Sequence, residues 1–206
     1  WIDQDASSHH EISSARSALP DGFRVIDIEL GCIMKVSSDC QYAALSYVWG
    51  QKYPEEIEAT LDNLDALCTP GHLYRIDLPK TIVDAISLCQ KLSISYLWVD
   101  RLCIVQDDAA QKHDQISAMD AIYSSAVLTI CAAAGNSSRS GLPGVGITKR
   151  PFSRMNLALS DIEIVPILTA FRECLADGQW LERGWTFQES LLGGRLLIFT
   201  DWQIFY

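Results

Sequence analysis

LPKTIVDAISLCQKLSISYLWVD, residues 78–100, is the stretch that decides the fold. Pro79 marks the start of a helix, because the first helical turn leaves its N–H groups unpaired and proline has none to lose. Apolar residues then recur every three or four positions and form one stripe, which is typical of a helix packed on a core. The stripe consists of Ile82, Ala85, Ile86, Cys89 and Leu92. The run that follows, ISYLWVD (94–100), predicts a buried strand.

A second helix and two further strands surround this unit. Asp108 is the expected cap of the second helix. Its inward stripe is expected to consist of Ile116, Met119, Tyr123 and Ala126. VLTICAAA (127–134) predicts a strand, and so does YAALSYVW (42–49), whose continuous apolar run before Gly50 indicates burial on both faces. Strand, helix, strand, helix, strand is the pattern of a parallel sheet with crossover helices.

The N-terminal part adds a hairpin to this sheet. FRVIDIEL (23–30) alternates apolar with acidic residues, which predicts a strand with one face in water, and CIMKV (32–36) predicts its partner after a turn at Gly31. Residues 1–22 are rich in Ser, His, Asp and Ala and predict a loose lead-in. We therefore expect residues 23–206 to form a single domain.

The C-terminal part completes the series with weaker signals. GLPGVG (141–146) lacks the order of a phosphate-binding loop and predicts a turn-rich connector. Residues 161–168 predict a strand interrupted by Pro166, 186–192 a short helix and 195–199 a last strand. Because the final residues are still apolar and strand-like, we expect the chain to be a fragment of a longer protein.

Composition excludes several classes of function. The 206 residues carry a formal net charge of -10, which repels phosphate backbones and disfavours nucleic-acid binding. No apolar run approaches the roughly 20 residues that a membrane span needs. The seven cysteines lie largely inside apolar runs, without C-x-x-C or zinc spacing, which favours buried reduced thiols in the cytoplasm. Cys103 beside His113 could be imagined as a nucleophile, but a buried thiol is the simpler interpretation.

Polar side chains gather where the predicted strands end. Ligands of open α/β sheets bind outside the carboxyl ends of the strands, where helix N-termini also present their N–H groups. Burial of the strand middles would explain apolar residues there, but not polar residues at the ends. The candidates for ligand binding are Ser46, Trp49, Gly50, Asp100, Arg101, Gln106, Arg183, Trp185 and Gln188, with Glu189 as the candidate catalytic residue.

Each of these candidates also has a structural interpretation. Asp100 and Arg101 could form a partly buried ion pair with each other at the strand end. Glu189 follows Thr186 by three residues, which is the spacing of a capping box. The tryptophans could pack at the core or its rim. The acidic pairs Asp107-Asp108 and Glu55-Glu56 are most simply solvated, with Asp108 capping its helix.

Three blocks of the sequence resemble the signature blocks of fungal heterokaryon-incompatibility (HET) domains. They are YAALSYVWG (42–50), the long run from Leu78 to Gly135, and RGWTFQESLLGGRLLIF (183–199), preceded by GLPGV (141–145). This resemblance implies a protein of filamentous fungi that triggers cell death after fusion of incompatible cells, or acts in related immune-like responses. It also implies that the domain is joined to further modules in a longer chain.

A second resemblance concerns chemistry. ALSY (44–47) is similar to the first strand of TIR domains, VLTICAA (127–133) to a later strand, and WTFQES (185–190) to the segment that carries their catalytic glutamate. Some TIR domains cleave the nicotinamide–ribose bond of NAD. Carried over to this sequence, the resemblance implies that Glu189 is the catalytic acid and that NAD or a related nucleotide is the substrate.

Cleavage of that bond passes through a ribosyl cation, which a nearby carboxylate stabilises. Trp49 or Trp185 could stack on nicotinamide or adenine, and Arg101 or Arg183 could pair with the diphosphate. The fold we expect is α/β, with a central, mostly parallel, flavodoxin-like or TIR-like sheet and an N-terminal hairpin. Two functions compete: an enzyme that consumes NAD without a required cofactor, and a non-enzymatic signalling module that self-associates or recruits partners. A third possibility is a degenerate domain that binds a nucleotide without turnover.

Overall fold

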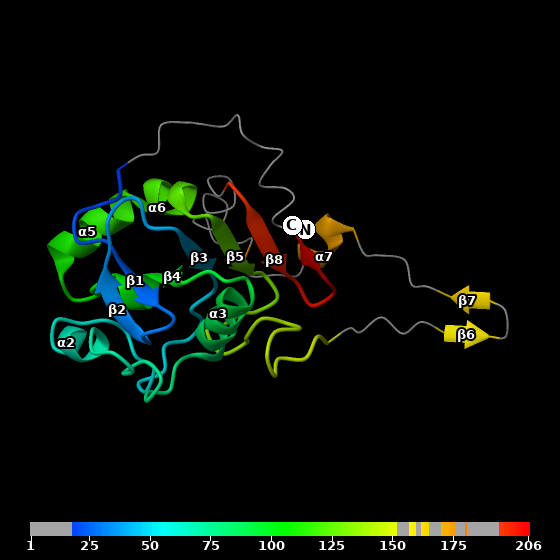
Figure 1. Cartoon of the computed structure of the whole chain (residues 1–206). Coiled ribbons are helices and arrows are strands. Elements are labelled where there is room, and N and C mark those ends of the chain that lie inside the picture. Colours follow the sequence, from blue (N-terminus) through cyan, green and yellow to red (C-terminus); the bar gives the residue numbers. More distant parts are fainter. Residues whose placement is uncertain (1–17, 152–156, 160–161, 165–169, 176–179, 181–193) are drawn as a thin grey trace.

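The computed structural model describes residues 18–151, 157–159, 162–164, 170–175, 180 and 194–206 (Figure 1). Its described strands form a seven-stranded sheet of order β2-β1-β4-β3-β5-β8-β9, and a separate pair of β6 (Leu157–Leu159) with β7 (Ile162–Ile164). The strands of the large sheet are β1 (Arg24–Asp27), β2 (Cys32–Lys35), β3 (Tyr42–Ser46), β4 (Tyr96–Trp98), β5 (Leu128–Ala132), β8 (Leu196–Phe199) and β9 (Ile204–Phe205).

The four central strands, β4, β3, β5 and β8, are parallel to one another. Along the sheet they follow the chain order second, first, third, fourth, which is the order of flavodoxin-like sheets. Antiparallel strands border this centre on both sides, namely the hairpin of β1 and β2 next to β4, and β9 next to β8. The predicted α/β class, parallel centre and N-terminal hairpin are confirmed.

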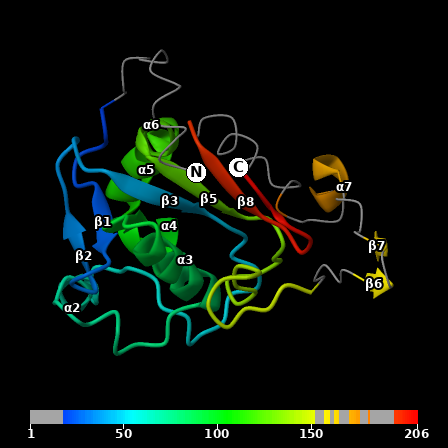
Figure 2. The same ribbon diagram turned by 45° about the vertical axis from the view of Figure 1, so that its right-hand side comes forward.

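Helices cover both faces of the sheet. Figures 1 and 2 place α3 (Lys80–Lys91) on one side and α5 (Ala109–Ser117) with α6 (Met119–Ser125) on the other. The helix α3 follows Pro79 as predicted. Asp108 caps α5, where its Oδ1 accepts the backbone N–H of Gln111 at 3.1 Å. Three shorter helices are α2 (Leu64–Leu67), α4 (Asp100–Cys103) and α7 (Phe171–Leu175).

The prediction of one face in water was wrong for β1, where all four residues are buried. The strand lies between β2 and β4, α4 packs against it, and its Arg24 Nη1 donates to Gln111 Oε1 of α5 at 2.7 Å. The alternating pattern continues in sequence beyond Asp27, but the chain turns there. Asp27 Oδ1 accepts the N–H of Leu30 at 2.8 Å, and Leu30 is exposed.

The second predicted helix is two helices, since the chain breaks at Ala118 between α5 and α6. The break turns α5, so that Ile116 is exposed rather than inward. Gln115 is buried in its place and donates through Nε2 to the carbonyl of Asp21 at 3.1 Å. The inward stripe therefore holds only for Tyr123 and Ala126, with Met119 half-buried.

The hydrophobic core lies on both faces of the parallel strands. Trp98 from β4 packs edge-on against Tyr123 of α6, with ring centroids 5.5 Å apart. A second cluster forms around Trp180 on the β5–β8 half of the sheet. The seven cysteines are free, and four of them are buried in the described chain: Cys32, Cys89, Cys103 and Cys131.

Candidate functional site

The carboxyl ends of the central strands lie at one edge of the sheet, because these strands are parallel. Ser46 ends β3, Trp98 ends β4 and Ala132 ends β5. From β3 the chain crosses to β4 on one side, whereas from β5, the neighbour of β3 on the other side, it continues outward to β8. The connections from β3 and β5 therefore run in opposite directions, which makes their carboxyl ends the switch point of the sheet. The structure brings together here the residues predicted after the first two strands and the loop after β5.

The first contact joins the ends of β3 and β4. Trp49 Nε1 donates to Asp100 Oδ2 at 2.8 Å, and the other oxygen, Oδ1, accepts the backbone N–H of Arg101 at 2.7 Å. Burial is the main reason why the pKa of Tyr47 is well above its usual value, and the negative charge of Asp100 raises it further. Trp49 and Asp100 are both half-buried, so they retain access to solvent at this edge.

The second contact joins the end of β3 to the loop after β5. Gly50 has a φ of +71°, and a Cβ there would lie 2.6 Å from Ser137 Cβ and 2.8 Å from the carbonyl oxygen of Asn136. The N–H of Ser138 donates to the carbonyl of Trp49 at 3.1 Å. Backbone geometry thus accounts for the glycine; its role toward a ligand stays a prediction.

Arg101 is buried and does form an ion pair, but Glu56 is its partner rather than Asp100. Arg101 Nη1 donates to Glu56 Oε2, and both side chains are almost fully buried. The guanidinium also lies over the indole of Trp49, 4.5 Å from its centroid, at the distance of a cation–π contact. The guanidinium is therefore engaged on two sides by the protein itself.

The prediction that Glu56 is solvated was wrong. Glu56 Oε1 accepts from Ser138 Oγ and from Arg139 Nε, both at 2.9 Å. Burial alone would raise the pKa of Glu56, but hydrogen bonds from Arg101, Arg139 and Ser138 outweigh it and lower the pKa. Only Glu55 is exposed as expected, and its side chain pairs with Arg139 at 2.8 Å.

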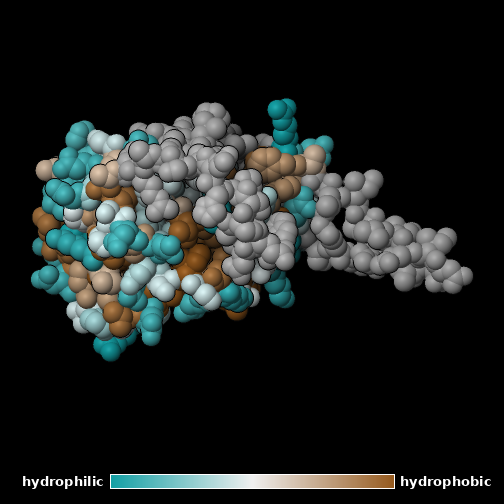
Figure 3. Space-filling view, turned by 45° about the horizontal axis from the view of Figure 1, so that its top comes forward, coloured by the Kyte–Doolittle hydropathy of each residue, from teal (hydrophilic) through white to brown (hydrophobic). Residues whose placement is uncertain are grey.

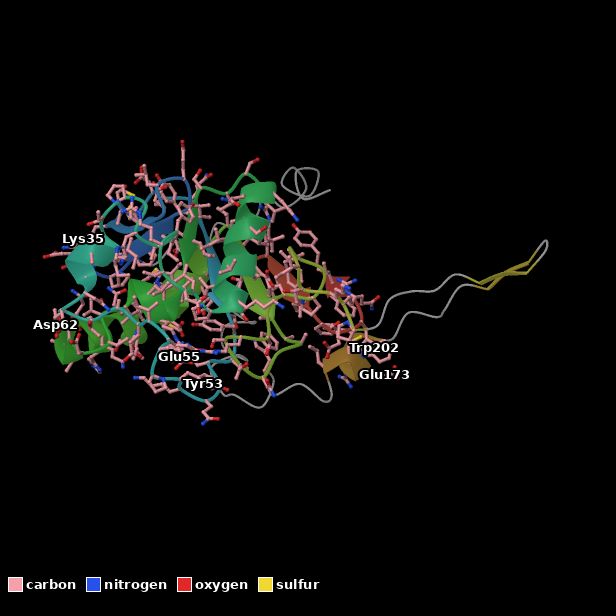
Figure 4. The ribbon with its side chains drawn as sticks, turned by 90° about the horizontal axis from the view of Figure 1, so that it is seen from below. Lys35, Tyr53, Glu55, Asp62, Glu173 and Trp202 are labelled. Atoms are coloured by element: carbon pink, nitrogen blue, oxygen red, sulfur yellow. The ribbon has the colours of Figure 1, made fainter. Side chains whose placement is uncertain are left out.

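No local pattern distinguishes Glu56 from Glu55, because the partners of Glu56 come from two distant segments. Arg139 also lies over the ring of Tyr53, 4.2 Å from its centroid. Figure 4 labels Tyr53 and Glu55, which lie next to each other in the loop after the first block. The residues that hold the edge together are thus partly outside the predicted set.

Ser46 and Gln106 have partners within the protein. Ser46 is buried, and its Oγ accepts from Trp180 Nε1 at 2.9 Å. Gln106 Nε2 donates to the carbonyls of Asp100 and Ile104 at 3.0 and 2.9 Å, which closes the turn after α4. Both residues lie at the predicted edge, and their contacts support its shape.

The remaining candidates, Arg183, Trp185, Gln188 and Glu189, lie outside the described residues, as does the helix expected over 186–192. Their roles stay predictions. Cys103 lies in the described part, and burial raises the pKa of its thiol to about 12. A thiol with that pKa carries too little thiolate for a nucleophile at neutral pH.

The loop GLPGVG (141–146) is a connector, as predicted, and it encloses a buried carboxylate. Asp84 of α3 accepts through Oδ2 from the N–H of Leu142 at 2.8 Å and from the hydroxyl of Thr148. The N–H of Gly141 donates to Thr81 Oγ1 at 3.0 Å. Asp84 is not among the predicted site residues, because an unbroken helical pattern gives no reason to single it out.

Two kinds of feature are absent from the part of the chain that the structure describes. No helix there is long and apolar enough to cross a membrane. No group of three or more His, Cys, Asp or Glu side chains there has the arrangement of a metal site.

Comparison with known proteins adds family membership to this geometry. The family model described as heterokaryon incompatibility protein (HET) matches residues 42–189. The chain is 30% identical over 101 residues to heterokaryon incompatibility protein 6, OR allele, of Neurospora crassa, covering 44% of this chain and 14% of that protein. No solved structure matches. Because the family model spans well over half of the sequence, the chain belongs to the heterokaryon incompatibility (HET) family, which takes part in fungal heterokaryon incompatibility.

Proposed function

We propose that this HET domain is a cytoplasmic effector of cell death in non-self recognition, and that it acts by hydrolysing the nicotinamide–ribose bond of NAD. In that reaction the glycosidic bond breaks, nicotinamide leaves with the bonding electrons, and water adds to the ribosyl carbon and releases a proton. A carboxylate beside the ribose stabilises the cationic transition state.

The observation that carries the proposal is the meeting of three segments at the switch point of a flavodoxin-ordered sheet. Trp49 and Asp100 are joined at 2.8 Å, and Gly50 packs against the loop that follows β5. Doubly wound sheets of this order bind nucleotides at that point. The half-buried Trp49–Asp100 pair supplies an aromatic ring and a carboxylate oriented by hydrogen bonds.

The roles divide between this edge and the third block. Glu189 is the proposed catalytic carboxylate, with Trp185 and Gln188 beside it. Arg183 is the proposed partner of the diphosphate, because Glu56 already holds the buried guanidinium of Arg101.

The test is nicotinamide release from NAD by the purified chain, free in solution and clustered on a surface. Wild type is expected to release nicotinamide, whereas Glu189→Gln is expected to lose at least about a hundredfold in rate. Glu173→Gln changes an exposed acid of α7 and serves as the matched control. Absence of release by clustered wild type would rule out the enzymatic mechanism for this chain.

A second candidate function is a non-enzymatic signalling module, and the surface around β9 and α7 favours it. Four large side chains are exposed there: Phe171, Trp202, Ile204 and Tyr206. Phe171 packs edge-on against Phe205 with centroids 4.8 Å apart, so α7 and β9 form one surface. Figure 4 shows Trp202 and Glu173 at this end of the molecule. Aromatic side chains grouped in this way are typical of protein–protein contacts.

Hydrophobic residues also reach the surface at separate places on the face shown in Figure 3, so exposure alone does not select the contact. The module hypothesis predicts that Trp202→Ala and Ile204→Ser abolish concentration-dependent association in sedimentation velocity. Ile147→Ser is the control, because Ile147 is the most exposed large apolar side chain that the structure describes and lies in a loop away from α7 and β9 in sequence. Association without any nicotinamide release would favour this second function.

A further inference from the structure

One carboxylate, that of Glu56, connects three segments at the edge of the sheet. Its Oε2 accepts from Arg101 Nη1 in α4. Its Oε1 accepts from Ser138 Oγ and Arg139 Nε in the loop after β5. Glu56 itself belongs to the loop that follows the first block, where its N–H donates to the carbonyl of Tyr53 at 3.1 Å. Three of its contacts thus span more than 40 residues of sequence.

The charges around Glu56 balance only when its carboxylate is ionised. Arg101 and Arg139 contribute two positive charges, and Glu55 and Glu56 contribute two negative charges. Glu55 and Arg139 are exposed, so water screens their pair. Arg101 is almost fully buried, so loss of the carboxylate of Glu56 would leave a buried cation without its counter-charge.

The ion pair extends to the residues of the candidate site. The guanidinium of Arg101 lies over Trp49, and the backbone N–H of Arg101 donates to Asp100. Trp49 in turn donates to the same carboxylate through Nε1. A displacement of Arg101 would therefore change the support of both the ring and the carboxylate. Side chains held in this way are pre-organised, which a binding site requires.

We propose that Glu56 is the positioning residue of the candidate site: it holds Arg101 against the ring of Trp49 and joins the loop after β5 to the same edge. Only the effect of Glu56 on nucleotide binding rests on the proposed function, since the Trp49 ring and the Asp100 carboxylate that Glu56 positions are those assigned to the nucleotide. The positioning itself is measurable without any substrate.

The experiment follows hydrogen exchange of the tryptophan indole N–H groups by NMR in the whole chain. Glu56→Gln is expected to speed exchange at Trp49 by about tenfold or more, as its hydrogen bond opens locally. Trp98 is fully buried, and the indole N–H of Trp180 donates to Ser46 rather than to Asp100, so both indoles are expected to keep wild-type exchange. Glu55→Gln, which changes the adjacent exposed acid, is expected to leave all three unchanged.

A second variant, Glu56→Asp, keeps the charge but is one methylene too short to reach both α4 and the loop after β5, and it is expected to speed exchange at Trp49 alone, to a smaller extent. Wild-type exchange at Trp49 in either folded variant overturns the proposal. Equal acceleration at all three indoles, or failure of both variants to fold, also overturns it, because Glu56 would then support the whole fold. If wild type releases no nicotinamide, the proposed function fails, while the exchange result still decides the role of Glu56. In an active domain, Glu56→Asp is expected to lower kcat/KM for NAD by up to roughly a hundredfold.

Discussion

Gly50→Ala is expected to destabilise the fold through its backbone rather than through loss of a ligand contact. The φ of Gly50 is +71°, a region that costs an L-residue about 1–2 kcal/mol. The new Cβ would lie 2.6 Å from Ser137 Cβ and 2.8 Å from the carbonyl oxygen of Asn136, and backbone cannot yield as a flexible side chain does. Displacement of that loop costs about 1–3 kcal/mol more.

The two costs add to about 2–5 kcal/mol, since they arise from the same residue but from separate torsional and steric causes. Urea unfolding followed by far-UV circular dichroism measures the change directly. For a chain of this size, the same loss lowers Tm by roughly 4–20 °C.

Gly194→Ala is the matched control. Gly194 lies outside the left-handed region, and a Cβ there would meet no described atom within 4 Å. Its substitution is expected to change the free energy of unfolding by less than about 1 kcal/mol, with stabilisation the more natural direction. If the free energy of unfolding of Gly50→Ala lies within about 0.5 kcal/mol of the wild-type value, the backbone explanation for this glycine is refuted.

Three further outcomes are expected. The folded-state pKa of Glu56 is lowered, so its ionisation stabilises the fold above the unfolded pKa of about 4.3, and this contribution is lost as pH falls through the folded value. Between about pH 6 and pH 3, the free energy of unfolding in urea should fall less steeply for Glu56→Gln than for wild type. An equal pH dependence in the two proteins would contradict the lowered pKa of Glu56. Asp84→Ala leaves two buried donors of the loop over α3 without their acceptor and is expected to cost about 2–4 kcal/mol, whereas the exposed Asp77→Ala should cost less than about 0.5 kcal/mol. In the native protein a thiol reagent at about pH 8 should modify the exposed Cys68 in a fast phase and spare Cys103, because burial raises the pKa of Cys103 to about 12. The fast phase should be absent in Cys68→Ser, and its persistence there would place the reactive thiol elsewhere.

The local patterns predicted the central fold well because they act over short distances. A helix after Pro79 and buried strands at 94–100 and 127–134 follow from periodicity and from the missing proline N–H. The prediction failed where distant segments decide burial. The strand β1 is buried on both faces because it lies between β2 and β4 with α4 packed against it, and Ile116 is exposed near the end of α5, where the chain breaks at Ala118.

The candidate site divides in the same way. That polar residues after parallel strands lie at one edge follows from topology alone, and the Trp49–Asp100 bond agrees with it. Topology does not indicate which of these polar side chains have bonding partners within the protein. Arg101 pairs with Glu56 rather than with Asp100, and nothing in the acidic pair at 55–56 indicates which side chain is buried.

By itself, the sequence determined the order of strands and helices, the parallel centre and the family blocks, since these depend on residue type and spacing along the chain. Only the tertiary structure decided that Glu56 carries the buried charge pair and that Gly50 must lack a side chain. The physical reason is that desolvation, ion pairing and steric contact depend on distances between atoms that lie far apart in sequence.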